Sequence, residues 1–459
     1  MPAAKATGIH ISRVGLASAI AMACLTVSVY REDCLRVPGL EGGMIGLVLF
    51  AVRGAMILLR DYVSWFLLAV SVVMLLRTAR GPLWRARHMK LFWLWLVFYL
   101  VQCLVSELDD ANVGFRLERL QLYQLPVLLP LLAIRIPGAP LLVRNWFFWA
   151  GTAQILATVV LRRWAGAGIG ALSEIQELEP GRLIIQSDTI TSSILLLQTA
   201  LCGLCIITDR SAPKLARFAA LFVVPIGVAL AIATGSRGPL VAFFFAFAAL
   251  IGYFAWTQWR KNSSLLVFAA LAVLLCALGA AVRSMQSELA VERLSTFAND
   301  LRKRETSEES ASIRLSYFEA ILRESPTAWG HGVSSFGKLV GQPTDYPHNI
   351  LMEAYYETGV VGVILFSAMA GYYLLRGAHR AMRTQRSGQV FGICLAVYYL
   401  AENQFSGGFP ASAMWAFALI LCQWASFDGQ NKPSAIFQER RQTDTGSVRH
   451  LGGASSGAP

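Results

Sequence analysis

Residues 346–366 read YPHNILMEAYYETGVVGVILF, a polar opening that turns into unbroken hydrocarbon. Pro347 cannot continue a helix from the upstream side but suits the start of one, so His348 and Asn349 are expected at the mouth of a descending helix. The apolar residues that follow are long enough to take this helix into a bilayer. The stretch therefore predicts a functional site with polar residues at the boundary of a membrane.

The composition of the whole chain is that of an integral membrane protein. Of its 459 residues, 55% are hydrophobic and 15% are charged, which is too apolar for a soluble domain. The apolar residues come in blocks of about 15 to 25, the length that crosses hydrocarbon as a helix. A membrane β-barrel would show short alternating segments instead. The predicted fold is an all-α, polytopic transmembrane helical bundle.

The apolar blocks predict about twelve spans. Block 44–76 is long enough for two helices, but two would send the basic N-terminus outside, so it is interpreted as one span with a re-entrant or interfacial piece. The blocks fall near residues 14–30, 44–76, 91–105, 117–134, 146–161, 190–207, 218–233, 239–256, 265–282, 349–375, 389–400 and 412–425.

Basic loops orient this bundle. Loop 77–90 carries five basic residues and no acid, and loop 376–386 carries four, so both are expected to be cytoplasmic. Counting spans puts loops 135–144, 210–217 and 260–261 on the same side. The external side then receives 106–116, 162–188, 234–238, 283–347 and 402–410.

Four regions follow from this topology. Residues 1–282 hold the first nine spans, 283–347 form a long external loop, 348–425 hold the remaining spans, and 426–459 form a disordered cytoplasmic tail. Within the long loop, the helical spacing of apolar residues predicts a helix over 312–324.

Several classes of partner are not expected. The net charge of +12 is spread over short loops, which indicates topology signals rather than a nucleic acid partner. Cys202 and Cys205 lie inside an apolar block and are interpreted as packing residues despite their CxxC spacing. The sequence has no HExxH motif and only scattered histidines, so no metal or other cofactor is predicted.

The turn TGSRGP at 234–239 is the shortest predicted external connection. Arg237 is costly there unless it meets an anion or a carboxylate, and the helix beginning near Pro239 would direct its positive dipole end outward. Ser236 is a candidate substrate contact in the same turn. The alternative is an arginine that reaches lipid headgroups, but the rigid Gly-Ser-Arg-Gly context favours an anion site.

Other polar residues are expected at the same face. Arg182 precedes a helix predicted near residue 188, and Arg314 lies on the predicted external helix. A histidine is largely neutral near pH 7 and can accept a hydroxyl proton, which makes His348 a candidate base. Taken singly, each arginine could be a surface residue and His348 a capping residue. Their common location indicates a shared function.

Three further residues are candidate sugar contacts. Trp329 lies in a Gly-punctuated loop and could stack on a sugar ring, although tryptophan is also common at membrane interfaces. Glu353 and Glu357 share one helix face close to the headgroup level, where they could bind sugar hydroxyls or pair with arginines. Asn349 stands beside His348 at the helix start.

Together, three motifs resemble the bacterial O-antigen ligase and polymerase superfamily of GT-C type integral-membrane glycosyltransferases. They are TGSRGPL at 234–240, SPTAWGHGVSSF at 325–336 and HNILMEAYYETGVVGVILF at 348–366. The resemblance implies that Arg237, Arg314 and His348 are catalytic and that the reaction needs no metal. Arg182 is a looser match, because LIIQSDTI after it departs from the expected Gly/Asn/Pro-rich stretch.

The resemblance also implies the substrates. The donor is a glycan on undecaprenyl diphosphate at the periplasmic leaflet of the bacterial inner membrane. The acceptor is a sugar of the lipid A core in ligases, or another lipid-linked repeat in polymerases. One dominant external loop favours the ligase. A transporter of lipid-linked sugars would show two halves with matching broken helices, which the sequence lacks.

Overall fold

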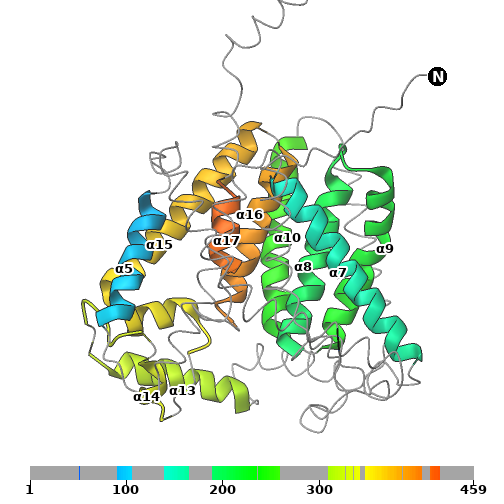
Figure 1. Ribbon diagram of the computed structural model, residues 1–459. Helices are drawn as coiled ribbons and strands as arrows, with labels where there is room; N and C mark the ends of the chain where they lie inside the picture. The colour runs from blue at the N-terminus through cyan, green and yellow to red at the C-terminus, as the bar shows by residue number, and fades with distance from the viewer. Residues whose placement is uncertain are drawn as a thin grey trace, which may run out of the picture.

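In the computed structural model, ten helices form within the described residues, with no strand among them (Figure 1). The described residues are 51, 90–105, 139–164, 189–234, 236–258, 309–325, 327–333, 335–341, 347–384, 386–405 and 414–423. The helices are α5 (Lys90–Val105), α7 (Ala139–Trp164), α8 (Thr189–Thr208), α9 (Lys214–Ala233), α10 (Arg237–Gln258), α13 (Glu309–Arg323), α14 (Phe336–Leu339), α15 (Ile350–Thr384), α16 (Ser387–Glu402) and α17 (Met414–Leu421).

The described helices other than α13 and α14 fall on the predicted apolar blocks. Four of them, α8, α9, α10 and α15, are long and apolar enough to cross a membrane, so the protein is membrane-embedded. The helix predicted over 312–324 is confirmed as α13. The predicted spans at 14–30, 44–76, 117–134 and 265–282, the tail and Arg182 lie outside the described residues, so the count of about twelve spans stays a prediction.

Helix α8 runs through the core of the bundle. Its side chains are buried on nearly every side, and it packs against α7, α9, α10 and α16. Small residues permit this close packing, because a side chain at Gly227 of α9 would come within 3.2 Å of the Leu196 carbonyl oxygen. Helix association inside a membrane depends on such contacts. Cys202 and Cys205 are buried here as free thiols, which confirms their interpretation as packing residues.

Aromatic side chains join α5, α15 and α17 into the other half of the core. Trp415 of α17 packs edge-on against Trp95 and Phe366, with ring centroids 5.1 and 5.2 Å away. All three side chains are at most 2% exposed. Edge-to-face contacts of this kind add to the stability gained from burial.

Contacts between helices show which helix ends lie together. Gly388 at the start of α16 lies against Pro140 at the start of α7. Near the end of α16, Tyr398 donates a hydrogen bond to the Ile194 carbonyl near the start of α8. Helices α9 and α10 follow α8 through short connections, so α10 starts at the same end of the bundle as α8. That end also holds the end of α16.

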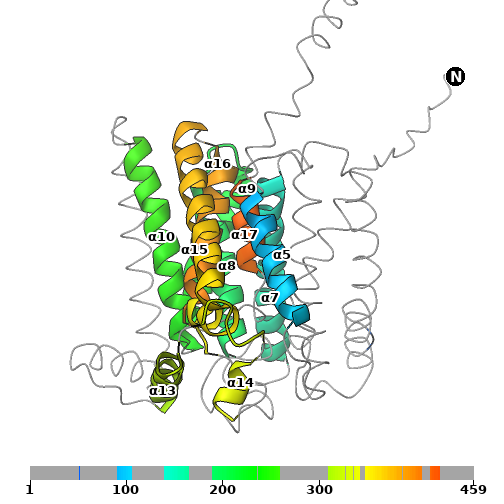
Figure 2. The same cartoon turned by 90° about the vertical axis from the view of Figure 1, so that its left-hand side faces the viewer.

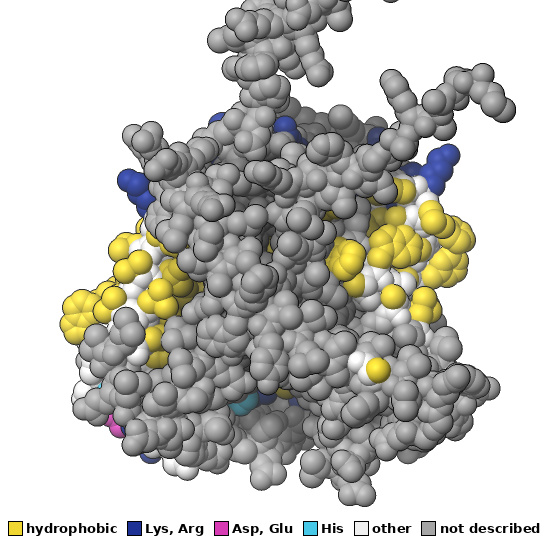
Figure 3. Space-filling model, viewed as in Figure 1, with side chains coloured by type: hydrophobic (Ala, Val, Ile, Leu, Met, Phe, Trp, Pro, Cys, Tyr) yellow, Lys and Arg dark blue, Asp and Glu magenta, His cyan; other side chains and the backbone are white. Residues whose placement is uncertain are grey.

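We call this end the rim. It comprises α13, α14, the first turns of α15, the last turn of α16 with residues 403–405, and the connection from α9 to α10 (Figures 1 and 2). Residues 139–144, 210–217 and 376–384 lie at the opposite end, as the charge pattern predicts. In Figure 3, apolar side chains lie on both flanks of the visible face, and the larger groups of Lys and Arg side chains lie at the end away from α13.

Candidate functional site

The first turn of α15 carries the predicted HN motif. Asn349 caps this turn, because its Oδ1 accepts hydrogen bonds from the N–H groups of Leu351 and Met352, both at 3.0 Å. His348 precedes the cap with φ of +53°, a conformation that few residues other than glycine adopt. The predicted place of both residues at a helix mouth is confirmed, and the histidine backbone is held in a strained turn.

Backbone carbonyls at the end of α16 bind this turn and the external helix together. The Asn403 carbonyl accepts the Ile350 N–H at 2.9 Å, and the Gln404 carbonyl accepts Asn349 Nδ2 at 3.1 Å. The next carbonyl, that of Phe405, accepts Arg314 Nη1 at 2.7 Å. Carbonyls past a helix end lack partners within that helix and carry its negative dipole end, which suits these donors.

Helix α15 contains a break that the sequence did not predict. At Gly359 the backbone has φ of +72° and ψ of −172°, so the block 349–375, predicted as a single span, consists of two helical parts. Figure 1 shows the part before the break lying across the end of the bundle beside α13 and α14, while the rest rises along α5. The break turns the first part of α15 into a rim element.

The loop from Thr327 to Gly332 fills the break from both sides. His331 and Gly332 donate backbone hydrogen bonds to the carbonyls of Tyr356 and Glu357, at 2.9 and 3.0 Å. In return, the N–H groups of residues 360 and 361 donate to the carbonyls of residues 327 and 328, at 3.1 and 3.2 Å. The backbone groups exposed by the break are therefore satisfied by the loop, as burial requires.

Two glycines make this docking possible. Gly330 has φ of +79°, and a Cβ there would overlap the Glu357 carbonyl. A Cβ on Gly359 would overlap the Ala328 carbonyl. Only glycine combines this backbone conformation with such close approach.

A small hydrophobic cluster fixes α13 and α14 on the first part of α15. Its buried members are Tyr317, Ile321, Phe336 and Tyr356. The Phe336 ring packs edge-on against Tyr317 and Tyr356, with centroids 5.2 and 6.0 Å away, and the His331 ring stacks on Tyr356 at 4.5 Å. Because Arg314 lies on α13, this cluster also holds the guanidinium at the rim.

Arg237 begins α10 at the same end of the bundle. The turn before it is closed by the Ser236 N–H, which donates to Thr234 Oγ1 at 3.2 Å, and Thr234 is fully buried. This confirms the tight connection predicted from the sequence. Arg237, Arg314 and His348 thus share the rim, although they come from three separate segments.

The other candidate residues are divided between the interior and the surface. Glu353 and Glu357 are fully buried, as is Glu402 of α16, so three carboxylates lie inside the protein near the rim. Enclosed carboxylates favour nearby cations. Trp329 is 62% exposed and lies at the break in α15, where its ring is 6.2 Å from that of Phe98 on α5. It therefore stands apart from the Asn349 cap.

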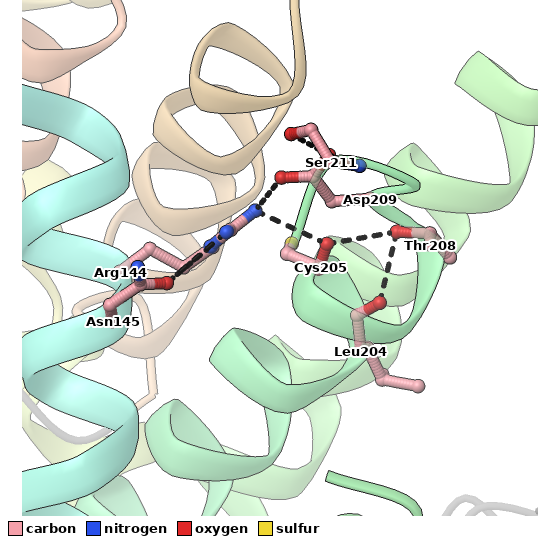
Figure 4. Close-up of polar contacts among 7 residues, drawn as sticks. All are labelled: Arg144, Asn145, Leu204, Cys205, Thr208, Asp209 and Ser211. Carbon is pink, nitrogen blue, oxygen red and sulfur yellow. Dashed lines mark hydrogen bonds and ion pairs between the residues drawn. The ribbon is translucent and has the colours of Figure 1, made fainter. Parts of the chain in front are cut away.

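The opposite end holds a charged pair that the sequence did not reveal (Figure 4). Arg144 Nη1 lies 2.8 Å from Asp209 Oδ2, and both side chains are buried. Asp209 Oδ1 accepts hydrogen bonds from the N–H and Oγ of Ser211, at 3.0 and 2.7 Å. Burial alone would raise the pKa of Asp209, but the hydrogen bonds from Ser211 and Arg144 lower it below its ordinary value.

The described residues contain no group of three or more His, Cys, Asp or Glu side chains placed to hold a metal ion. The rim offers guanidinium groups, a histidine, helix N-termini and aromatic rings instead. These groups suit a ligand that carries negative charge and sugar.

A family model described as O-antigen ligase matches residues 218–367. Residues 218–367 thus carry an O-antigen ligase domain, which supports the resemblance to the O-antigen ligase superfamily. No curated protein matches the chain. The matched range runs from α9 into the second part of α15, so the O-antigen ligase domain includes Arg237, Arg314 and His348. The turn 403–405, which sequence reasoning also missed as a site element, lies outside that domain.

Proposed function

We propose that this protein is an O-antigen ligase-type glycosyltransferase of the bacterial inner membrane, with its rim facing the periplasm. It transfers a glycan from undecaprenyl diphosphate to a sugar hydroxyl of the lipid A core. The observation that carries the proposal is the turn 403–405, whose carbonyls bind Arg314 and the Asn349 cap at the end of the bundle where Arg237 begins α10. The match of residues 218–367 to the O-antigen ligase family model supports it.

The arginines act on the diphosphate leaving group. A glycosyl diphosphate already has a good leaving group, so catalysis needs chiefly to neutralise the charge that develops on it. Arg237 and Arg314 offer fixed, bidentate donors for this charge. Arg237 stands at the N-terminus of α10, where the helix dipole adds a positive potential. Arg182 would serve the same anion from the preceding external loop.

His348 prepares the acceptor. Its imidazole takes the proton from the attacking hydroxyl, a step that contributes about 10² to 10⁴ in rate. The strained backbone at His348 and the cap at Asn349 fix the direction of the ring. A single displacement at the anomeric carbon would invert its configuration. In this proposal Ser236, Asn349 and Glu353 bind substrate hydroxyls, and the exposed ring of Trp329 stacks on a sugar.

A polymerase that joins lipid-linked repeats is the second candidate, because it uses the same donor and the same chemistry. The sequence feature that favours the ligase is the dominance of one long loop, 283–347, which ends at the HN motif. The two functions leave different products.

The test is complementation of a strain that lacks its own copy, with surface polysaccharide resolved on a gel. We expect His348→Ala and Arg237→Ala to abolish function, while Arg323→Ala, on the exposed side of α13, behaves as wild type. In cells that carry an inactive variant, long polymer that stays on its lipid carrier, with no polysaccharide attached to lipid A (no capped lipid A), would identify a ligase. Short unpolymerised repeats in these cells would identify a polymerase. Capped lipid A at the wild-type level in both mutants would refute the assignment.

A further inference from the structure

A column of buried polar side chains descends from the rim into the bundle. Asn403, whose carbonyl accepts the first N–H of α15, donates its Nδ2 to the Tyr399 carbonyl at 2.6 Å. One turn deeper, Tyr399 Oη donates to Gln198 Oε1 of α8 at 2.6 Å. All three side chains are at most 1% exposed. Residues from α8 and α16 thus continue the polar rim inward.

Two amide atoms in this column are not satisfied within the part of the chain that the structure describes. Gln198 Nε2 and Asn403 Oδ1 are buried and have no hydrogen-bond partner there. A buried polar group left unsatisfied costs about 1–3 kcal/mol, and hydrocarbon around the bundle offers no replacement partner. The two atoms are one donor and one acceptor, which is the complement of hydroxyl groups.

We propose that Gln198 and Asn403 form a subsite that hydrogen-bonds ring hydroxyls of the sugar next to the diphosphate. This inference rests on the proposed function. The subsite is neutral, so it suits a sugar better than the diphosphate, which the arginines attract. It is also joined to the rim, because the Asn403 carbonyl accepts the N–H of Ile350, two residues beyond His348.

The subsite would help the enzyme to select which glycan it transfers. A site built to hydrogen-bond a hydroxyl strongly rejects an analogue that lacks it, because the buried amide then loses its partner. Gln198, Tyr399 and Asn403 all lie outside the matched domain of residues 218–367. The shared domain would therefore supply the transfer chemistry, and α8 and α16 would supply recognition of the sugar.

The test uses purified protein in proteoliposomes and the pair of substitutions Gln198→Leu with Tyr399→Phe. Removing both partners of one hydrogen bond leaves neither of them orphaned, so the fold is expected to persist. We expect KM for the lipid-linked glycan to rise about tenfold, the worth of one hydrogen bond. Inhibition by undecaprenyl diphosphate without sugar should be unchanged. Tyr398→Phe is the control, because it removes another α16–α8 hydrogen bond and should leave KM as it is.

A second measurement needs only the wild-type protein. Donors that lack a single ring hydroxyl on the first sugar are compared with the parent donor, and at least one is expected to show a KM about tenfold higher. The proposal is overturned if every such donor is used like the parent, or if the double variant keeps the wild-type KM, as it would if the amides held only water. It is also overturned if sugar-free undecaprenyl diphosphate loses affinity equally. No transfer by the wild type would refute the proposed function itself.

Discussion

The two ends of the bundle are built in different ways. At the opposite end, Arg144 meets Asp209, and Ser211 completes the carboxylate's hydrogen bonds. At the rim, Arg314 and Asn349 are anchored by backbone carbonyls of residues 405 and 404. A positive charge held by a neutral carbonyl is positioned by that contact without being neutralised by it.

Backbone strain is distributed in the same way. Within the described residues, every residue with positive φ lies at or beside the rim: His348 and glycines 330, 332, 341 and 359. The break in α15 lies there too, while the residues before α9 and α16 at the opposite end, Pro213 and Arg386, have ordinary negative φ. Strain of this kind collects where a protein positions groups for function. The comparison indicates that the end with Arg144 and Asp209 stabilises the fold and that the rim carries out the reaction.

The largest expected effect is that of a substitution at His348, which should lower the rate of transfer without lowering the stability of the fold. His348→Ala should reduce transfer by about 10²- to 10⁴-fold, the contribution of a general base, while the melting temperature of the detergent-solubilised protein changes little. Initial rates of transfer and thermal unfolding check the two halves of this expectation. Transfer at the wild-type rate would remove His348 from the chemistry.

Asp209→Asn should show the reverse behaviour. It leaves the buried Arg144 without its charged partner, which costs about 3–5 kcal/mol of stability for a buried pair. Transfer per folded molecule should stay the same, because the pair lies at the other end of the bundle. Equilibrium unfolding measures the loss, and Glu319→Gln, in an exposed pair with Arg323, serves as the control with no measurable change. A stable Asp209→Asn protein that cannot transfer would contradict the division between the ends.

Gly359→Ala tests the break in α15. Alanine at this φ costs about 1–3 kcal/mol in backbone strain, and its Cβ would displace the loop at Ala328. Turnover should therefore fall about tenfold as the first part of α15 moves. The matched control is Gly371→Ala in the same helix, where an added Cβ meets nothing within 4 Å. Equal activity of the two variants would show that the break does not position His348.

The smallest effect is the response of the Asp209 pair to acid. Because its pKa is lowered in the folded protein, its contribution to stability is complete above the unfolded value of about 3.9. That contribution is lost as the pH falls through the folded pKa. The difference in unfolding free energy between wild type and Asp209→Asn should therefore shrink below about pH 4. A difference that stays constant down to pH 2 would argue against the ionised pair.

The sequence predicted the helices of the described part well, because hydrocarbon thickness imposes a long apolar block for each span. It also placed Arg237, Arg314 and His348 at one end. Basic loops mark the cytoplasmic side of the membrane, and counting the spans from them assigns every other loop to a side. These inferences use local composition and counting alone.

The features that the sequence did not predict depend on long-range or backbone contacts. The break at Gly359 exists because the loop from residue 327 supplies replacement hydrogen bonds, and a glycine inside GVVGV gives no sign of such a partner. The turn 403–405 acts through carbonyls, which every residue possesses. Arg144 and Asp209 are separated by 65 residues, and the sequence places Arg144 in a basic loop but does not single out Asp209.

The most direct test of the central claim is the release of undecaprenyl diphosphate by protein reconstituted with a lipid-linked glycan and a lipid A-core acceptor. The account predicts that wild-type protein releases it in step with formation of capped lipid A, and that His348→Ala and Arg237→Ala release it at least about 10²-fold more slowly. Equal release by the wild type and both variants would contradict it. Movement of the intact lipid-linked glycan across the bilayer, with no release, would contradict it as well.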